Sequence, residues 1–373
     1  MSLPHTLATA EINTAALSQN FSVLQAELAR LKGTSITLIA VVKANAYGHG
    51  FSLAIPAFLR AGCSFFAVAN LGEALAVRQL APAARILILG YTPPQHAQTL
   101  TKNHIEQAVF SLTYAKALEK EAKQYNCRVS IHIKIDGGMC RLGFSPTALR
   151  QILAVTALPH LTPVGLFTHF PSADSDKVTT RTALSRFLAC RDALNEKGHT
   201  FFCHAAASAA ALTLPDTLLD GARIGLAIYG IPPVKTELLL SPALRLVAPI
   251  VQIHSVPKGT TVGYGGDFVT ARPSRIGTCP IGYADGIFRA FSGETVTVFH
   301  KQVPYKSRVV GRICMDQLML DLTDTPAKVG DSVLLFDDPR PMASTLHTIP
   351  YEILTSIGAR VARQEISKKE VFT

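Results

Sequence analysis

The first two thirds of the chain alternate short apolar runs with longer segments of helical periodicity, and this alternation most constrains the fold. Eight runs rich in branched residues are predicted strands: 36–44, 64–70, 85–90, 105–111, 128–135, 163–170, 201–208 and 222–230. Each precedes a plausible helix, such as "LGEALAVRQLA" after the second run. Eight strand–helix units in about 240 residues predict a (β/α)8 barrel of the TIM type.

The pattern changes after "YGIPP" (229–233), where β-branched runs are separated by Gly and Pro, as in "LRLVAPIVQIHSV" and "ETVTVFH". This is typical of a mostly β domain. We therefore expect residues 1–240 to form the barrel and 241–373 a C-terminal β domain, on which the extreme N-terminus could pack. Residues 366–373 are expected to be a solvated tail.

Composition narrows the class of protein. A chain of 373 residues with 48% hydrophobic content can bury a large core. The seven cysteines are scattered and show no C-x-x-C spacing, which favours reduced thiols over a disulfide framework or a structural zinc site. We expect no metal.

The charge and the apolar segments bear on partners and location. The net charge is +10, but the lysines and arginines are spread along the chain and there is no tryptophan, so we expect no nucleic-acid binding. No apolar run approaches the length of a membrane span, and the start does not resemble an export signal. We expect a cytoplasmic protein without membrane contact.

Reactive side chains gather at one end of the predicted barrel. In such barrels the active site lies at the carboxyl ends of the strands. The residues expected there are Lys43, Arg141, His169, Ser208, Arg223 and Gly225. A nucleophilic lysine, an arginine and an anion site are what a pyridoxal phosphate enzyme requires.

The fifth predicted strand, "IHIKID", has a polar face of His132, Lys134 and Asp136, which we expect inside the barrel. A buried lysine is costly unless it is paired or neutralised. Pairing of Lys134 with Asp136, the proximity of Arg141 and a covalent modification are all open explanations.

A phosphate site is expected after the seventh and eighth strands. Ser208 heads "ASAAAL", where a hydroxyl at a helix start can cap the helix and meet an anion, and Gly225 permits close backbone approach. Capping alone is the alternative for Ser208.

Motifs along nearly the whole chain resemble those of alanine racemases, in family order. They are "VVKANAYGHG", "KIDGGMCRLG", "GLFTHF", "HAAASAA", "ARIGLAIYG", "IGYADG", "VGRICMDQ" and "YEILTSIGARV". "IGYADG" and "GRICMD" are the most specific to this family. The departures are Ala207 in place of a common asparagine, "DGGM" in place of D-T-G-M, and Ile287-Phe288 after "YADG".

The resemblance implies a pyridoxal 5'-phosphate enzyme that racemises alanine with two bases. Lys43 would hold the cofactor covalently, and Tyr283 would be the second acid/base group on the opposite face of the substrate. Arg223 would meet the pyridine nitrogen, with His169 in the same network. Because an arginine does not readily donate its proton, transamination would be disfavoured.

The resemblance also implies roles for further residues. The phosphate would be surrounded by Tyr47, Ser208, Gly225, Leu226 and Tyr351. Arg141 and the Met315 amide would meet the substrate carboxylate or the cofactor's phenolic oxygen, and Lys134 matches a position that can be carbamylated. A substrate corridor would contain Asp174, Arg312 and Ile349, although a surface ion pair is the plainer interpretation of the first two.

The family resemblance further implies a homodimer in which Tyr283 and Met315 complete the partner's site, and a role in supplying D-alanine for peptidoglycan. One alternative is a pyridoxal phosphate barrel of another activity, such as a broad-specificity amino-acid racemase or a basic amino-acid decarboxylase. The other is a non-catalytic pyridoxal phosphate carrier. "GYADG" argues against a decarboxylase, and the β domain after residue 240 argues against a carrier.

Overall fold

The computed structural model describes residues 7–366, and the chain forms two compact units. The barrel unit comprises Ala16–Ala46 and Ala54–Ser241. The β unit comprises the described residues up to Ala15, then Tyr47–Leu53, and the described residues from Pro242 onward. The tail expected at 366–373 lies outside the described residues except for Ile366.

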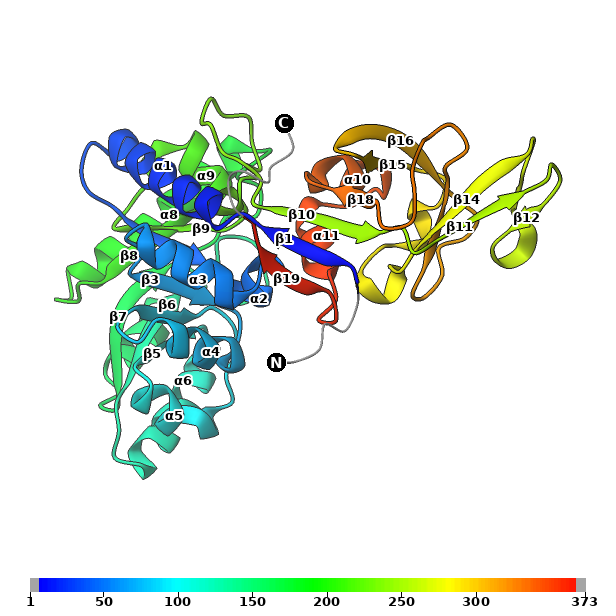
Figure 1. The fold of residues 1–373 in the computed structure, drawn as a ribbon. Helices are drawn as coiled ribbons and strands as arrows, with labels where there is room; N and C mark the ends of the chain where they lie inside the picture. Colours follow the sequence, from blue (N-terminus) through cyan, green and yellow to red (C-terminus); the bar gives the residue numbers. More distant parts are fainter. Residues whose placement is uncertain (1–6, 367–373) are drawn as a thin grey trace. The chain divides into compact units, whose positions relative to one another are not determined.

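Eight parallel strands close into a barrel in sequence order (Figure 1), which confirms the predicted (β/α)8 barrel. The strands are β2 (Thr37–Val41), β3 (Phe65–Val68), β4 (Arg85–Ile88), β5 (Ile105–Val109), β6 (Val129–Lys134), β7 (Leu161–Phe167), β8 (Phe202–Ala207) and β9 (Gly221–Ile224). The barrel closes where β2 pairs with β9, with Thr37 opposite Gly221.

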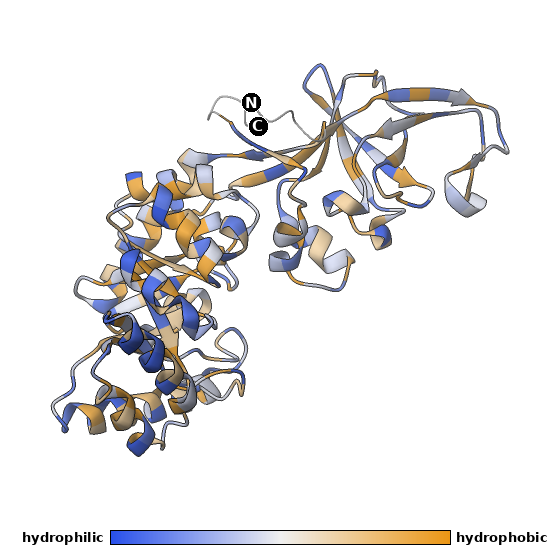
Figure 2. Cartoon of the chain, turned by 90° about the horizontal axis from the view of Figure 1, so that it is seen from below, coloured by the Kyte–Doolittle hydropathy of each residue, from blue (hydrophilic) through white to orange (hydrophobic). Residues whose placement is uncertain are grey.

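Helices surround the barrel strands in Figure 1. They are α1 (Thr14–Lys32), α3 (Phe51–Arg60), α4 (Leu71–Leu80), α5 (Ala97–Lys102), α6 (Leu112–Gln124), α7 (Leu149–Thr156), α8 (Lys177–Asn195) and α9 (Ser208–Thr213), with 3-10 turns η1 (Pro94–His96), η2 (Pro215–Thr217) and η3 (Leu226–Tyr229). In α6 the buried residues Tyr114, Ala115, Leu118 and Ala122 share one face. The helices accordingly carry both hydrophilic and hydrophobic residues (Figure 2).

The last barrel strand is shorter than the sequence indicates. The apolar run 222–230 was expected to be one strand, but β9 ends at Ile224 and η3 follows. Gly225 causes the break because its φ of −104° and ψ of −105° lie outside the β region. Within the described residues, β9 is followed by the 3-10 turn η3 and not by an α-helix. The segment after η3 contacts α1, where the Asn20 side chain donates a hydrogen bond to the Ser241 carbonyl at 2.9 Å.

The β unit is built on a nine-stranded, mostly antiparallel sheet, which confirms the expected C-terminal strand-rich domain. In spatial order the strands are β11 (Gln252–Val256), β14 (Ser274–Cys279), β17 (Leu318–Asp321), β16 (Val303–Val310), β15 (Thr295–His300), β18 (Ser332–Phe336), β10 (Leu244–Pro249), β1 (Thr9–Ile12) and β19 (Ala362–Glu365). The N-terminal strand β1 therefore lies in this sheet, between β10 and β19.

Short elements complete the β unit. They are a ribbon of β12 (Thr261–Val262) and β13 (Phe268–Val269), helices α10 (Pro339–Thr345) and α11 (Pro350–Ser356), and turns η4 (Tyr264–Gly266), η5 (Tyr283–Asp285) and η6 (Arg289–Phe291). In the segment "YEILTSIGARVARQ" only the first part is helical, within α11, and the end belongs to β19. Within residues 7–366, no helix combines the length and the apolar character that crossing a bilayer requires.

Candidate active site

Lys43 stands at the carboxyl end of β2 and begins a left-handed turn, α2 (Lys43–Tyr47). Ala44, Asn45 and Ala46 have φ values of 54°, 52° and 56°, and Tyr47 has a φ of 51°. Left-handed conformation costs an L-residue roughly 1–2 kcal/mol. Such strain is retained where the surrounding structure enforces it, and it is common at functional sites.

Glu73 of α4 holds the start of this turn. Its carboxylate accepts hydrogen bonds from the Ala44 amide at 2.7 Å and the Ala69 amide at 2.8 Å. The carboxylate therefore ties the segment after Lys43 to the segment after β3. Neither this contact nor the handedness of the turn could be expected from a period-of-two or period-of-3.6 pattern.

The Lys43 amine is adapted to lose its proton. Part of the side chain reaches solvent, but partial burial lowers the pKa of Lys43, the Arg141 cation lowers it further, and Glu73 acts in the opposite direction. A neutral amine is the form that acts as a base or nucleophile.

Arg223 on β9 is buried and held by several acceptors. Its Nη1 donates to His204 Nδ1 at 2.7 Å and to the His204 carbonyl at 2.9 Å. Its Nη2 donates to the Thr168 and Ala205 carbonyls at 2.6 and 3.0 Å. Among the described residues no acceptor is found for Nε–H, so this N–H is the one available to a bound molecule.

Burial lowers the pKa of Arg223 to about 9, which still leaves the guanidinium protonated at neutral pH. His169 follows β7, and its Nδ1 lies 3.4 Å from Arg223 Nη2. Burial first, and then the Arg223, Arg141, Lys134 and Lys43 cations, lower the pKa of His169 to about 3. His169 is therefore a neutral imidazole at the pH of catalysis.

Lys134 at the end of β6 is 6% exposed, and its polar strand face lines the barrel as expected. Burial first, and then Arg141 and Arg223, lower the pKa of Lys134 to about 8, against the attraction of Asp136. An ion pair with Asp136, one of the three open explanations, is not formed between these two described residues. The Asp136 carboxylate instead accepts from the backbone amides of Gly138, Met139 and Cys140.

Ser208 and Gly225 meet as expected, but Ser208 does not cap its helix. Helix α9 begins at Ser208, with Ala207 at the cap position and no side-chain capping bond. The Ser208 hydroxyl instead accepts from the Gly225 amide at 3.1 Å. This contact joins the start of α9 to the start of η3, where Leu226 is the first residue, so two element N-termini lie together.

The predicted residues of the β unit are held by backbone contacts. The Tyr283 amide donates to the Cys314 carbonyl, and the Ala284 amide to the Met315 carbonyl, both at 3.0 Å. Gly282 is required at this crossing because a Cβ there would lie 2.3 Å from the Cys314 oxygen. The turn that carries Tyr283 therefore has a fixed relation to Met315.

An ion-pair clamp reinforces the same arrangement. Arg360 donates to the buried Asp285 at 2.7 Å and to Asp316 at 2.6 Å, and Asp285 accepts from the Gly282 amide at 2.9 Å. Since Asp285 closes the Tyr283 turn and Asp316 follows Met315, the guanidinium links the two segments. None of these three residues was expected from the sequence.

Tyr47 and Tyr351 lie together in the β unit, with ring centroids 5.9 Å apart. Burial, and then the neighbouring Tyr351, raise the pKa of Tyr47, so it is a neutral hydroxyl. Gly48 packs against α11 so closely that a Cβ would lie 2.1 Å from the Leu354 oxygen. The other residues expected at the phosphate, Ser208, Gly225 and Leu226, belong to the barrel unit.

The three corridor residues are divided between the units, with Asp174 in the barrel unit and Arg312 and Ile349 in the β unit. Arg312 forms an ion pair with Asp267, Asp174 is exposed between β7 and α8, and Ile349 is exposed just before α11. Arg312 therefore makes a surface ion pair with Asp267 of its own unit, and the corridor itself stays a prediction.

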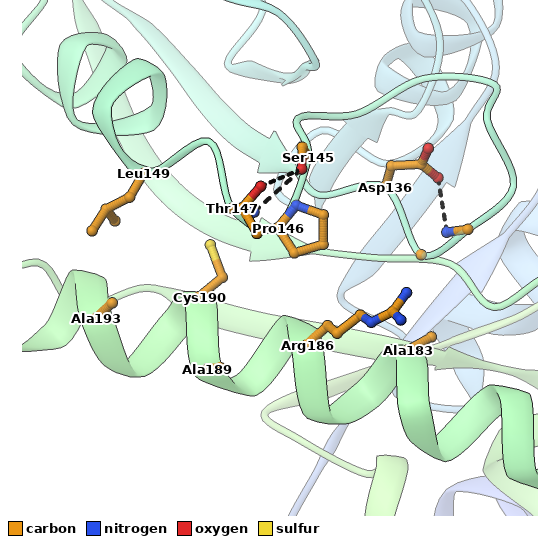
Figure 3. A pocket seen from close by; sticks show the side chains of 12 residues that line it. Asp136, Ser145, Pro146, Thr147, Leu149, Ala183, Arg186, Ala189, Cys190 and Ala193 are labelled. Carbon is orange, nitrogen blue, oxygen red and sulfur yellow. Dashed lines mark hydrogen bonds between the residues drawn. The ribbon is translucent and has the colours of Figure 1, made fainter.

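A cavity of about 610 Å³ lies beside this site in the barrel unit (Figure 3). It is bounded by the segment after β6, including Asp136 and Ser145, and by α8, including Arg186 and Cys190. Lys43, His169 and Arg223 do not line it, so we place the chemistry at the strand ends rather than in this cavity.

Two family models cover almost all of the chain. The model described as "Alanine racemase, N-terminal domain" matches residues 12–233, and "Alanine racemase, C-terminal domain" matches residues 243–365. A curated alanine racemase from Clostridium perfringens is 41% identical over 342 residues, which cover 87% of this chain and 88% of the relative.

Solved structures of alanine racemases are also similar to this chain. An alanine racemase from Clostridium difficile 630 is 33% identical, with a TM-score of 0.89 and coverage of 99% of this chain and 97% of that chain. An alanine racemase from Bartonella henselae with covalently bound pyridoxal phosphate is 30% identical, with a TM-score of 0.84 and coverage of 96% and 99%.

Proposed function

Because this chain belongs to the alanine racemase family, we propose that Lys43 and Tyr283 are the two acid/base groups of its reaction. The protein is a pyridoxal phosphate-dependent racemase that interconverts L-alanine and D-alanine. The relatives support this activity and not the carrier or broad-specificity alternatives.

The residues of the barrel unit fit pyridoxal phosphate. Lys43, Lys134, Arg141 and Arg223 are close enough to affect one another's charge, which favours an anionic ligand. The paired N-termini of α9 and η3 suit a phosphate group, with Ser208, Gly225 and Leu226 as contacts. When bound, the cofactor acidifies the Cα–H bond of the amino acid.

Arg223 carries the argument most directly. Four of its donors are engaged by the protein, and the remaining Nε–H suits the pyridine nitrogen, which is an acceptor. The guanidinium keeps its proton at neutral pH, so this residue orients the ring without protonating it. Proton exchange at Cα is then favoured over transamination.

The two acid/base groups would work on opposite faces of Cα. The lowered pKa of Lys43 favours the neutral amine, which is the form that can remove a proton from one face. Tyr283 would donate or accept a proton at the other face through its hydroxyl. Arg141 and the Met315 amide would orient the substrate carboxylate, and Tyr47 and Tyr351 would add hydroxyl contacts to the phosphate.

We propose that the enzyme is a homodimer with shared sites. Tyr283 is 43% exposed and Met315 is 53% exposed in the single chain, although backbone hydrogen bonds fix the segments that carry them. Tyrosine and methionine side chains of this kind are enriched at interfaces. The corridor formed by Asp174, Arg312 and Ile349, a cytoplasmic location and the supply of D-alanine for peptidoglycan stay predictions.

The activity is tested by incubating the purified protein with L-alanine and following D-alanine. Borohydride reduction before peptide mapping then identifies the lysine that holds the cofactor. We expect D-alanine to form and the label to lie on Lys43. Label on another lysine would remove Lys43 from its proposed role.

We propose that Lys134 is carbamylated. Its pKa of about 8 leaves a substantial neutral fraction near pH 7.5, and a neutral amine adds CO2 to form a carbamate with loss of one proton. The resulting anion would orient Arg141. We expect intact mass spectrometry under gentle conditions to detect the mass of one added CO2.

The matched variant is Lys134→Arg, which keeps the charge but cannot be carbamylated. We expect its KM for alanine to rise about fivefold, because a hydrogen bond to a charged group contributes about 1.5–3 kcal/mol and part of it would be replaced. An unmodified mass together with an unchanged KM in Lys134→Arg would contradict the carbamate.

A further inference from the structure

A chain of hydrogen-bonded side chains crosses the barrel interior from Arg223 to Glu106. Arg223 Nη1 lies 2.7 Å from His204 Nδ1, and His204 Nε2 lies 2.8 Å from His132 Nδ1. His132 Nε2 lies 2.5 Å from Glu106 Oε2. The four residues come from β9, β8, β6 and β5, so the chain connects strands on different sides of the barrel.

While Arg223 is a cation, the hydrogen bonds from Arg223 to Glu106 can have only one donor-to-acceptor direction. A guanidinium is a donor only, so His204 must accept at Nδ1 and carry its proton at Nε2. His204 then donates to Nδ1 of His132, which must carry its own proton at Nε2 and donate it to Glu106. The geometry thus assigns the Nε2–H tautomer to both imidazoles.

Both histidines are fully buried and neutral. Burial first, and then the Arg223 cation, lower the pKa of His204, and burial lowers the pKa of His132 despite the opposing effect of Glu106. Phe167 stacks on His204 with centroids 4.8 Å apart and planes 7° from parallel. The rings therefore have little freedom to turn.

The far end of the chain is an ionised carboxylate. Arg85 binds Glu106 through two hydrogen bonds of 2.8 and 3.0 Å, and its guanidinium lies 4.1 Å from the centroid of Phe65. Burial by itself would raise the pKa of Glu106, but the hydrogen bonds from His132 and Arg85 outweigh it and lower the pKa. The two neutral imidazoles thus lie between the Arg223 cation and the Glu106 anion.

The backbone leaves room for this chain at Gly165 on β7. A Cβ at this position would lie 2.1 Å from His132 Nδ1. The register of β6 and β7 also shifts between Ile131 and His132, immediately before the ring. The strand geometry therefore accommodates the imidazole where Arg223 and Glu106 can both be reached through the pair of rings.

We propose that Glu106 and His132 are positioning residues for racemisation, which act through His204 to hold Arg223 as an oriented cation. The proposal rests on the proposed function, in which Arg223 meets the pyridine nitrogen. The hydrogen bond from Arg223 Nη1 to His204 fixes the rotation of the guanidinium, so that its Nε–H keeps one direction. Neither residue touches substrate or cofactor.

The first measurement is the ¹⁵N spectrum of the imidazoles in the unaltered protein with labelled histidine. We expect His132 and His204 each to have a protonated Nε2 and an unprotonated Nδ1. Assignment comes from the disappearance of signals in His132→Gln and His204→Gln. A protonated Nδ1 on either ring would overturn the chain, whether or not the protein racemises alanine.

The second measurement compares Glu106→Gln with Glu119→Gln. Glu119 makes an equivalent contact, with Oε1 2.7 Å from His160 Nδ1, and its side chain is 12% exposed like that of Glu106, but it has no link to Arg223. A glutamine at position 106 has the same shape as glutamate but can also donate a hydrogen bond to His132. The donor-to-acceptor direction of the hydrogen bonds between Glu106 and Arg223 is then no longer fixed. Circular dichroism checks the folding of both variants.

We expect Glu106→Gln to show mixed tautomers at His132 and a kcat about tenfold lower, with little change in KM for alanine. Pyridoxamine formation per turnover should rise. Glu119→Gln should resemble the unaltered enzyme in the His132 tautomer, in kcat, in KM and in pyridoxamine formation. Equal effects of the two substitutions, or an unchanged kcat in Glu106→Gln, would overturn the proposal.

Gly165→Ala provides an independent variant because its methyl group would displace the His132 ring while every polar residue remains. We expect the same loss of kcat and the same rise in pyridoxamine. Wild-type kinetics in a folded Gly165→Ala protein would count against positioning through His132. Failure of the proposed function would be recognised separately, as absence of D-alanine formation by the unaltered enzyme.

Discussion

Replacement of Lys43 by alanine is expected to abolish racemisation and to prevent covalent attachment of the cofactor. The side chain would serve both as the covalent anchor and as one of the two bases, so its removal eliminates two functions at once. We expect a loss of at least about 10⁴-fold in kcat/KM in both directions. The rates are measured as D-alanine formed from L-alanine and the reverse.

The control for loss of a lysine is Lys116→Ala, on the exposed face of α6. It should keep wild-type rates and the borohydride label on Lys43. Activity of Lys43→Ala within tenfold of the unaltered enzyme would contradict both proposed functions of this residue. Because the left-handed turn is held by Glu73 and not by the Lys43 side chain, the variant should fold.

Tyr283→Phe is the second substitution for which we expect a large loss of activity. It removes one hydroxyl and leaves the ring and the backbone contacts to Cys314, so the turn should keep its shape. Acid/base groups typically contribute 10²–10⁴-fold, and we expect kcat to fall about 10³-fold in both directions. Cofactor binding, followed by its absorption spectrum, should be unchanged.

A more specific consequence concerns hydrogen exchange at Cα. In Tyr283→Phe, Lys43 would still exchange the α-hydrogen of one enantiomer with deuterated water, without racemisation. Tyr264→Phe is the matched control, since Tyr264 is a 70% exposed tyrosine of the same unit. Racemisation within twofold of the unaltered rate in Tyr283→Phe would remove this residue from the mechanism.

Much of the barrel could be predicted from the sequence because the hydrophobic period and the number of units are physically restrictive. The eight runs correspond to β2 to β9, and Lys43, His169 and Arg223 follow from the rule that catalytic residues lie at strand ends. The prediction was wrong at 222–230, where the apolar pattern continues past Gly225 although the backbone leaves the β region.

Contacts between distant residues were out of reach. His132 was expected inside the barrel, but its partners Glu106 and His204 lie on strands whose relative register no local pattern specifies. For Ser208, helix capping was the alternative interpretation, and its hydroxyl instead accepts a hydrogen bond from the Gly225 amide. Arg360 likewise contacts Asp316 and Asp285, which lie 44 and 75 positions away in the sequence, so no local pattern could predict these ion pairs.

The residue of the β unit that we propose to be catalytic was a different case. Periodicity does not distinguish Tyr283 from a core tyrosine; only the resemblance of "GYADG" to a family motif singled it out. The structure adds a physical observation, since this tyrosine is exposed although its turn is rigid. That combination motivates the central proposal that Tyr283 of one chain and Lys43 of the other act on the same substrate molecule.

The most direct test of that proposal is the activity of a heterodimer in which one chain carries Lys43→Ala and the other Tyr283→Phe. Two different tags allow the mixed dimer to be purified after the chains are refolded together. If sites are shared, one of the two sites keeps both groups, and we predict about half of the wild-type activity per dimer. If both groups act within one chain, both sites are damaged and the heterodimer would be as inactive as either parent.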